Sequence, residues 1–124
     1  MQEGTEFRVI YTLMANGSAL MEEFRPKDGP TMVTMFFVDG DRLLATHYCA
    51  ARNQPHMATE PIADSSAKSV AFRLVRVTGL SSPGDWHNTG LVVTLEDRDH
   101  VTQEWTYLSN GKTGTTFFHL TRER

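Results

Sequence analysis

Apolar and polar residues alternate along most of the chain, which is the pattern of β-strands that bury one face. The segment 5–14 places four apolar or aromatic residues on one face: Phe7, Val9, Tyr11 and Leu13. The alternation recurs at 70–77 and again between 91 and 107. No stretch keeps a helical period over about 11 residues or more. The pattern therefore predicts an all-β chain of short strands.

Three Asn-Gly or Asp-Gly pairs predict tight β-hairpins, because both central positions of such turns need a positive φ. The pairs are Asn16-Gly17, Asp39-Gly40 and Asn110-Gly111. As a two-residue loop, the first pair places Tyr11 opposite Glu22 on a face that is otherwise apolar. The second pair places Met32 opposite His47, and Cys49 shares their face.

The last three expected strands share one apolar face on which Gln103 also lies. Its apolar members are Leu91, Val93, Leu95, Val101, Trp105, Phe118 and Leu120. Residues 58–69 are polar, and residues 78–88 are rich in Gly, Ser and Pro, so both segments are expected to be loops. The second of these loops is placed to cover an open end of a barrel.

About eight strands joined by short turns, without crossover helices, predict an antiparallel meander. An open sheet of that size exposes two edges, and closure into an up-and-down β-barrel removes them. We therefore expect residues 1–124 to form a single β-barrel domain with room for one small ligand. A two-sheet sandwich around a solid core is the alternative.

Charge and composition exclude several classes of protein. The formal net charge of −3 and the pI of about 5.9 argue against a nucleic-acid-binding surface. Cys49 is the only cysteine, which excludes an intrachain disulfide. No apolar run reaches the length of about 18 residues that a membrane-spanning helix needs. Residues 1–20 lack the pattern of a signal peptide, so we expect either a cytoplasmic protein or an exported one whose signal peptide has been removed.

The predicted registers bring several polar side chains onto the inward face, as in a ligand pocket with apolar walls and a few placed polar groups. Glu22, His47 and Gln103 are expected to orient the polar end of a ligand. The remaining expected ligand-binding residues are Tyr11, Met32, Phe36, Cys49, Trp105 and Phe118. The leading hypothesis is therefore a barrel that binds a small apolar or amphipathic molecule. A satisfied structural network that fixes the strand register is the alternative.

Two further hypotheses use the same residues for chemistry. In the first, His47 acts as a general acid or base and Glu22 orients its imidazole. In the second, His47 and Cys49, two residues apart on one strand face, bind haem or a metal ion with help from His56 or His87. Structural zinc usually shows ligand pairs at both ends of the site, and only one pair exists here, so the sequence assigns no metal ligands and no cofactor.

Three stretches resemble a family of uncharacterised bacterial lipocalin-like (calycin-type) domains. They are GSALMEEF at 17–24, MVTMFFVDGDRLLATHYCAARNQPHM at 32–57 and VTQEWTYLSNGK at 101–112. The resemblance spans nearly the whole chain and implies a calycin-like β-barrel without implying an activity. Members of the family tend to begin with a strand that bears Trp and Gly, and this chain lacks that strand before Thr5.

The resemblance and the apolar pattern together predict a homodimer. Loss of a first strand leaves an open edge along 5–14, and exposed edges recruit partners. The central hairpin is also apolar on its second face, at Val33, Met35, Phe37, Leu44 and Tyr48. The alternative is a monomer in which the loop at 78–88 covers that face.

Overall fold

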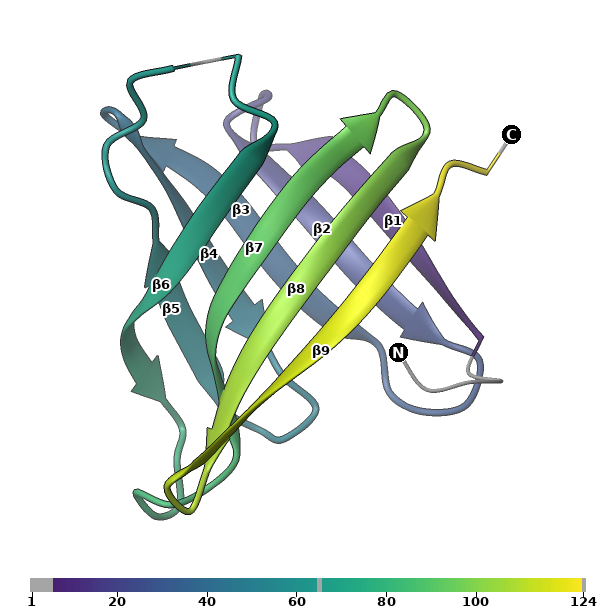
Figure 1. The fold of residues 1–124 in the computed structure, drawn as a ribbon. Coiled ribbons are helices and arrows are strands. Elements are labelled where there is room, and N and C mark those ends of the chain that lie inside the picture. Colours follow the sequence, from purple (N-terminus) through teal and green to yellow (C-terminus); the bar gives the residue numbers. More distant parts are fainter. Residues whose placement is uncertain (1–5, 65, 124) are drawn as a thin grey trace.

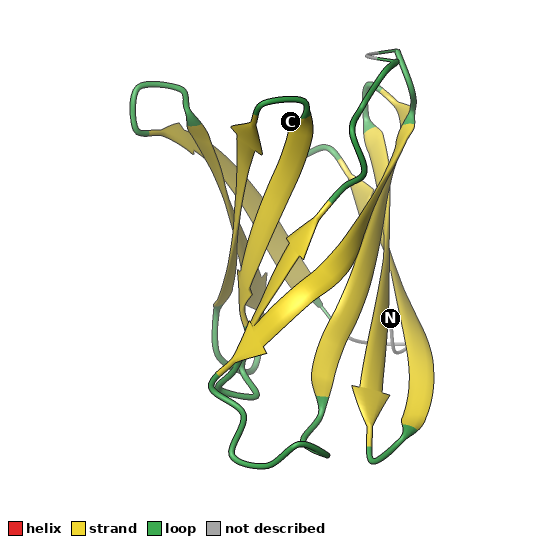
Figure 2. Cartoon of the chain, turned by 90° about the vertical axis from the view of Figure 1, so that its left-hand side faces the viewer, coloured by secondary structure: helices red, strands yellow, loops and turns green. Residues whose placement is uncertain are grey.

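The computed structural model describes residues 6–64 and 66–123, and these form one antiparallel sheet of nine strands (Figure 1). The strands are β1 (Phe7–Met14), β2 (Ala19–Pro26), β3 (Met32–Asp39), β4 (Arg42–Tyr48), β5 (Gln54–Ala58), β6 (Ser69–Thr78), β7 (His87–Asp97), β8 (His100–Ser109) and β9 (Lys112–Thr121). Each strand pairs with its neighbours in sequence, so the sheet is a simple up-and-down meander. Figure 2 shows the sheet curled into a half-barrel. The described residues contain no helix, and hence none long and apolar enough to cross a membrane.

The core lies inside this half-barrel, where the apolar faces of the strands meet. Its most buried apolar residues are Ala45, Met57, Phe72, Leu91 and Trp105. On β4, Ala45 and His47 are buried while Tyr48 is exposed, so the face that carries His47 is the inner one. The sequence of this strand is apolar on both faces, so the pattern does not show which face points inward. The curvature of the sheet decides it.

Two of the three predicted turns are confirmed, and with the first turn the predicted register of its hairpin. In the first hairpin, Asn16 and Gly17 have φ values of 59° and 83°, and Tyr11 pairs with Glu22. In the last hairpin, Asn110 and Gly111 have φ values of 49° and 79° and join β8 to β9. Both turns therefore use the positive φ values that these residue pairs tolerate.

The predicted register of the central hairpin is wrong by two residues. Asp39 pairs with Arg42, so the loop consists of Gly40 and Asp41, and only Gly40 has a positive φ, at 63°. This matches a turn with Gly at its first central position. As a result Thr34, rather than Met32, lies opposite His47. A shift of two residues keeps every side chain on its predicted face.

The alternation of apolar and polar residues did not predict a ninth strand, β5, which ends where the loop 58–69 was expected to begin. Pro55 lacks a backbone donor, and the strand is only five residues long, so the strand signal is weak. Pro55 and Met57 nevertheless point into the core and are buried. The loop that follows therefore spans only 59–68.

The ends of the meander, β1 and β9, form a seam in which no strand pairing occurs among the described residues. An odd number of antiparallel strands makes these two edge strands run parallel to each other, unlike every other neighbouring pair in the sheet. Side chains span the seam instead: the rings of Phe7 and Phe118 are 5.5 Å apart, and Arg8 Nη2 lies 3.4 Å from Glu123 Oε2. Thr5, where the first strand was predicted to begin, lies outside the described residues.

Candidate functional site

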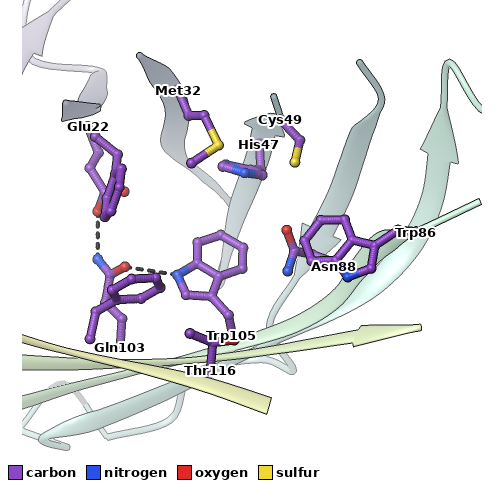
Figure 3. A pocket seen from close by; sticks show the side chains of 11 residues that line it. Glu22, Met32, His47, Cys49, Trp86, Asn88, Gln103, Trp105 and Thr116 are labelled. Atoms are coloured by element: carbon purple, nitrogen blue, oxygen red, sulfur yellow. Dashed lines mark hydrogen bonds between the residues drawn. The ribbon is translucent and has the colours of Figure 1, made fainter. Parts of the chain in front are cut away.

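A cavity of about 210 Å³ opens at the end of the half-barrel that holds the turns 27–31, 49–53 and 79–86. Both tryptophans of the chain, Trp86 and Trp105, line it, and we call it the tryptophan cavity. Other members of its wall are Met32, Cys49 and Phe118 on the apolar side and Glu22, His47, Asn88 and Gln103 on the polar side. Figure 3 shows these residues, apart from the unlabelled Phe118, arranged around a common space.

A hydrogen-bonded network forms one side of the tryptophan cavity. The Tyr11 hydroxyl donates to Glu22 Oε2 at 2.7 Å, and Gln103 Nε2 donates to the same oxygen at 2.7 Å. Gln103 Nε2 also lies 3.1 Å from the Tyr11 hydroxyl, and Trp105 Nε1 donates to Gln103 Oε1 at 3.0 Å. The inward Glu22 and Gln103 that the sequence predicted are therefore paired with each other in the interior.

Burial governs the protonation of this network. Glu22 is 3% exposed, and burial raises the pKa of its carboxyl group, while hydrogen bonds from Tyr11 and Gln103 oppose that rise. The pKa of Tyr11 is also raised, by burial first and by the nearby Glu22 carboxylate second. Both network bonds reach Oε2, so Glu22 Oε1 makes no hydrogen bond within the described residues. This oxygen is free to meet a ligand.

His47 belongs to a different set of contacts. Its Nδ1 is 2.8 Å from the Thr34 hydroxyl, and its ring lies 4.8 Å from the Trp105 ring. Burial lowers the pKa of His47 to about 4, so the imidazole is neutral near pH 7. Its Nε2 has no hydrogen-bond partner among the described residues. Thr34 therefore orients His47, and no hydrogen bond joins it to Glu22.

The remaining histidines do not gather around Cys49. The Cys49 thiol lines the tryptophan cavity, and burial raises its pKa. His56 faces outward, with its ring nitrogens near the hydroxyls of Thr46 and Thr78 at 3.4 Å and 3.1 Å. His87 Nδ1 lies 2.8 Å from the backbone carbonyl of Asp85 in the preceding loop. Within residues 6–64 and 66–123, no cluster of three His, Cys, Asp or Glu side chains is placed to hold a metal ion.

The nine predicted ligand-binding residues divide between two cavities. Seven of them line the tryptophan cavity: Glu22, Met32, His47, Cys49, Gln103, Trp105 and Phe118. Tyr11 and Phe36 line a second cavity, of about 460 Å³, at the opposite end of the half-barrel. The Tyr11–Glu22 hydrogen bond lies between the two, so the polar network separates them.

Sequence reasoning missed Trp86, which lines the tryptophan cavity from the loop 79–86. The loop is fixed from two sides: Asn53 Nδ2 donates to the Trp86 carbonyl at 2.9 Å, and the Asn110 amide donates to the Gly84 carbonyl at 3.0 Å. The Trp86 ring also stacks on Tyr107 at 5.3 Å. The available signal for Trp86 was its position in a Gly-, Ser- and Pro-rich loop that was expected to cover one end of a barrel.

Asn88, Phe24 and Thr116 were missed for a different reason. Phe24 lies near the end of β2 and Thr116 in the middle of β9, while Asn88, expected in the loop 78–88, is the second residue of β7. A strand pattern alone does not show which part of a strand lines a cavity. Comparison of the chain with protein-family models, with curated proteins and with solved structures finds no match. The fold and site define an all-β half-barrel with an internal, partly polar cavity.

Proposed function

We propose that this protein is a calycin-like binding protein that holds a compact amphipathic molecule in the tryptophan cavity. The single observation that carries the proposal is that Glu22 and His47, which are 3% and 6% exposed, line a mainly apolar cavity, while no hydrogen bond to Glu22 Oε1 or His47 Nε2 is found among the described residues. Buried polar groups normally have partners, and a bound molecule would supply them.

The cavity volume limits the size of the ligand. An apolar cavity of about 150 Å³ is large enough for benzene. The tryptophan cavity, at about 210 Å³, therefore suits a body of one or two rings. Trp86, Trp105 and Phe118 supply aromatic walls for that body. A hydroxyl, carbonyl or amide group on the ligand would face His47 and Glu22.

The acid–base hypothesis has less support from the geometry. A general base works best with a pKa near the working pH, and burial holds the pKa of His47 at about 4. Thr34 occupies the position at Nδ1 where an orienting carboxylate was expected. Haem or metal binding would have to rely on His47 and Cys49 without the other histidines.

The calycin-like assignment is supported by the up-and-down order of the strands and by the half-barrel shape. The resemblance of three stretches of the sequence to lipocalin-like domains points in the same direction. We further propose that two copies associate through the outer face of β1 to β5. One row across these five strands is apolar throughout: Met14, Ala19, Phe37, Leu44 and Ala58.

Intrinsic fluorescence tests ligand binding directly, because both tryptophans line the cavity. We expect at least one compound from a panel of one- and two-ring alcohols, ketones and amides to change the emission and to raise the melting temperature. Thr116→Phe, which fills the cavity, should weaken that binding by about tenfold or more, since steric overlap is costly in a packed site.

Thr115→Phe is the matched control, because Thr115 is the neighbouring residue on β9 and is exposed on the opposite face. It should leave the affinity unchanged. The proposal fails if no compound in the panel alters the wild-type emission, or if Thr116→Phe binds as tightly as Thr115→Phe while both variants remain folded by circular dichroism.

A further inference from the structure

We propose that the opposite end of the half-barrel holds a second ligand site, which takes an apolar chain that ends in a cationic amine. The site is the cavity of about 460 Å³, which we call the apolar cavity. Its wall is formed mostly by aliphatic and aromatic side chains, among them Leu13, Leu20, Phe36, Leu43, Phe72 and Val93. The volume lies within the range of about 300 to 1,000 Å³ that is typical of small-molecule sites.

The mouth of the apolar cavity leaves large apolar side chains uncovered. Leu13 is 70% exposed, Val38 is 65% exposed and Leu95 is 52% exposed, and all three line the cavity. They come from three different hairpins, which meet at this end of the half-barrel. A hydrocarbon chain that entered between them would remove this apolar surface from water.

The turns around this mouth are strongly acidic. The segments 39–42, 60–68, 96–99 and 122–123 together carry eight Asp or Glu residues and four Lys or Arg residues. Two hydrogen bonds hold the first three of these segments beside one another: the Ile62 amide donates to the Asp41 carbonyl at 2.8 Å, and the Leu95 amide donates to the Lys68 carbonyl at 2.8 Å. At the other end of the half-barrel, the turns 27–31, 49–53, 79–86 and 110–111 carry two acidic and two basic residues.

This difference in charge between the two ends of the half-barrel favours some ligands of the apolar cavity over others. A ligand with an ammonium group at the mouth is attracted by the surrounding carboxylates, whereas a fatty acid or an anionic membrane surface is repelled. A second copy of the chain docked mouth to mouth would place two acidic rings against each other. At the inner end, Tyr11 already donates its hydroxyl to Glu22, so the inner wall offers an apolar ring to the chain terminus.

Three probes with the same alkyl chain separate the contributions of the cavity and the charge: decylamine, decanol and decanoate, each titrated calorimetrically at neutral pH below its aggregation concentration. We expect decylamine to bind about tenfold or more tightly than decanoate, with decanol between them. The ratio should fall towards one when the salt concentration rises from about 20 mM to about 500 mM, because salt screens exposed charges. Equal affinities at low salt would overturn the preference for an amine.

Substitutions locate the probe. Val70→Phe, which fills the apolar cavity, should weaken decylamine binding by about tenfold or more, whereas Ala71→Phe, on the exposed face of the same strand, should not. If Val70→Phe does not fold, Leu13→Asn replaces it, because Leu13 lines the cavity but is mostly exposed. Unchanged affinity in the folded variant would overturn the site.

A charge variant and the tryptophan-cavity variant complete the test. Replacing Asp39, Asp41 and Glu96 by their amides should lower the affinity ratio of decylamine to decanol several-fold, while Asp28→Asn at the other end should not change it. Thr116→Phe should leave decylamine binding intact. If Thr116→Phe abolishes it instead, decylamine occupies the tryptophan cavity and the second site is refuted, whereas a failure of ring compounds to bind would leave the second site standing.

Discussion

At the scale of single residues, burial rather than ion pairing controls the titratable groups of the interior. His47 is neutral because burial disfavours its charged form and lowers its pKa to about 4. Burial also disfavours the charged form of Glu22, which for a carboxyl group raises the pKa. The two residues therefore respond to pH in opposite directions. The stability that depends on neutral His47 is lost as the pH falls. The stability that depends on Glu22 is lost as the pH rises above the pKa of this carboxyl group in the unfolded chain, about 4.5.

The His47 contribution can be isolated by substitution. In the unfolded chain His47 titrates near 6.5, and in the folded protein it titrates near 4, so the unfolded state binds the proton first on acidification. The free energy of unfolding should therefore fall by roughly 3 kcal/mol between these two pH values. His47→Gln should remove most of this loss, as measured by urea denaturation across that pH window. Glu22 is common to both proteins, so its opposite slope cancels in the comparison; parallel pH profiles for the two proteins would contradict the assigned burial effect.

At the scale of strands, side chains compensate for the missing pairing between β1 and β9. Gln103 on β8 donates hydrogen bonds to Glu22 on β2 and to Tyr11 on β1. It also accepts one from Trp105, and it is only 2% exposed. This single amide therefore connects the two ends of the meander through the interior, and the Phe7–Phe118 contact adds a second connection.

Gln103→Leu tests that connection. The substitution leaves the Trp105 ring N–H without a partner and removes one donor from Glu22, and orphaned buried polar groups cost about 1 to 3 kcal/mol each. We expect a loss of about 2 to 4 kcal/mol in the free energy of unfolding, and faster hydrogen exchange at the amides of β1. Glu104→Leu, on the opposite face of the same strand, is the control and should change stability by about 0.5 kcal/mol or less. Equal effects of the two substitutions would show that the interior network does not hold the seam.

At the scale of the whole molecule, the outer face of the central hairpin carries large apolar side chains that are partly exposed. Phe37 and Tyr48 are 36% and 49% exposed on the outer face of the central hairpin. The loop 79–86 is bound to Asn53 and Asn110 at the end of the half-barrel, where it lines the tryptophan cavity. The covering loop of the monomer alternative is thus engaged elsewhere, which favours the proposed homodimer.

Light scattering at micromolar concentration measures the association. The wild-type protein should have about twice the mass of one chain, and Phe37→Glu should reduce it to the mass of one chain, because a charge in the centre of an apolar interface is costly to bury. Val75→Glu is the control, since Val75 is 69% exposed on β6, outside the five strands of the proposed interface. A monomeric wild-type protein would refute the dimer, and a dimeric Phe37→Glu variant would refute the interface.

Local sequence patterns determined the strands and their inner faces. Alternation over β1 and β8, together with turn pairs such as Asn16-Gly17 and Asn110-Gly111, was sufficient to place Tyr11 opposite Glu22 and to turn Gln103 inward. These features depend only on neighbouring residues within one hairpin. There, the two-residue period of the strands and the positive φ of the turn allow few alternative registers.

Only the tertiary structure decided how those faces meet. The β5 strand, with Pro55 in it, is held by pairing with β4 and β6 rather than by its own propensity. The partner of His47 changed from Met32 to Thr34 because the turn adopted Gly40 and Asp41 as its loop, an alternative that preserves every face. The division of the interior into two cavities depends on a contact between Gln103 and Glu22, which are 81 residues apart in the chain. Contacts at such separations are set by the curvature of the whole sheet, which no local pattern encodes.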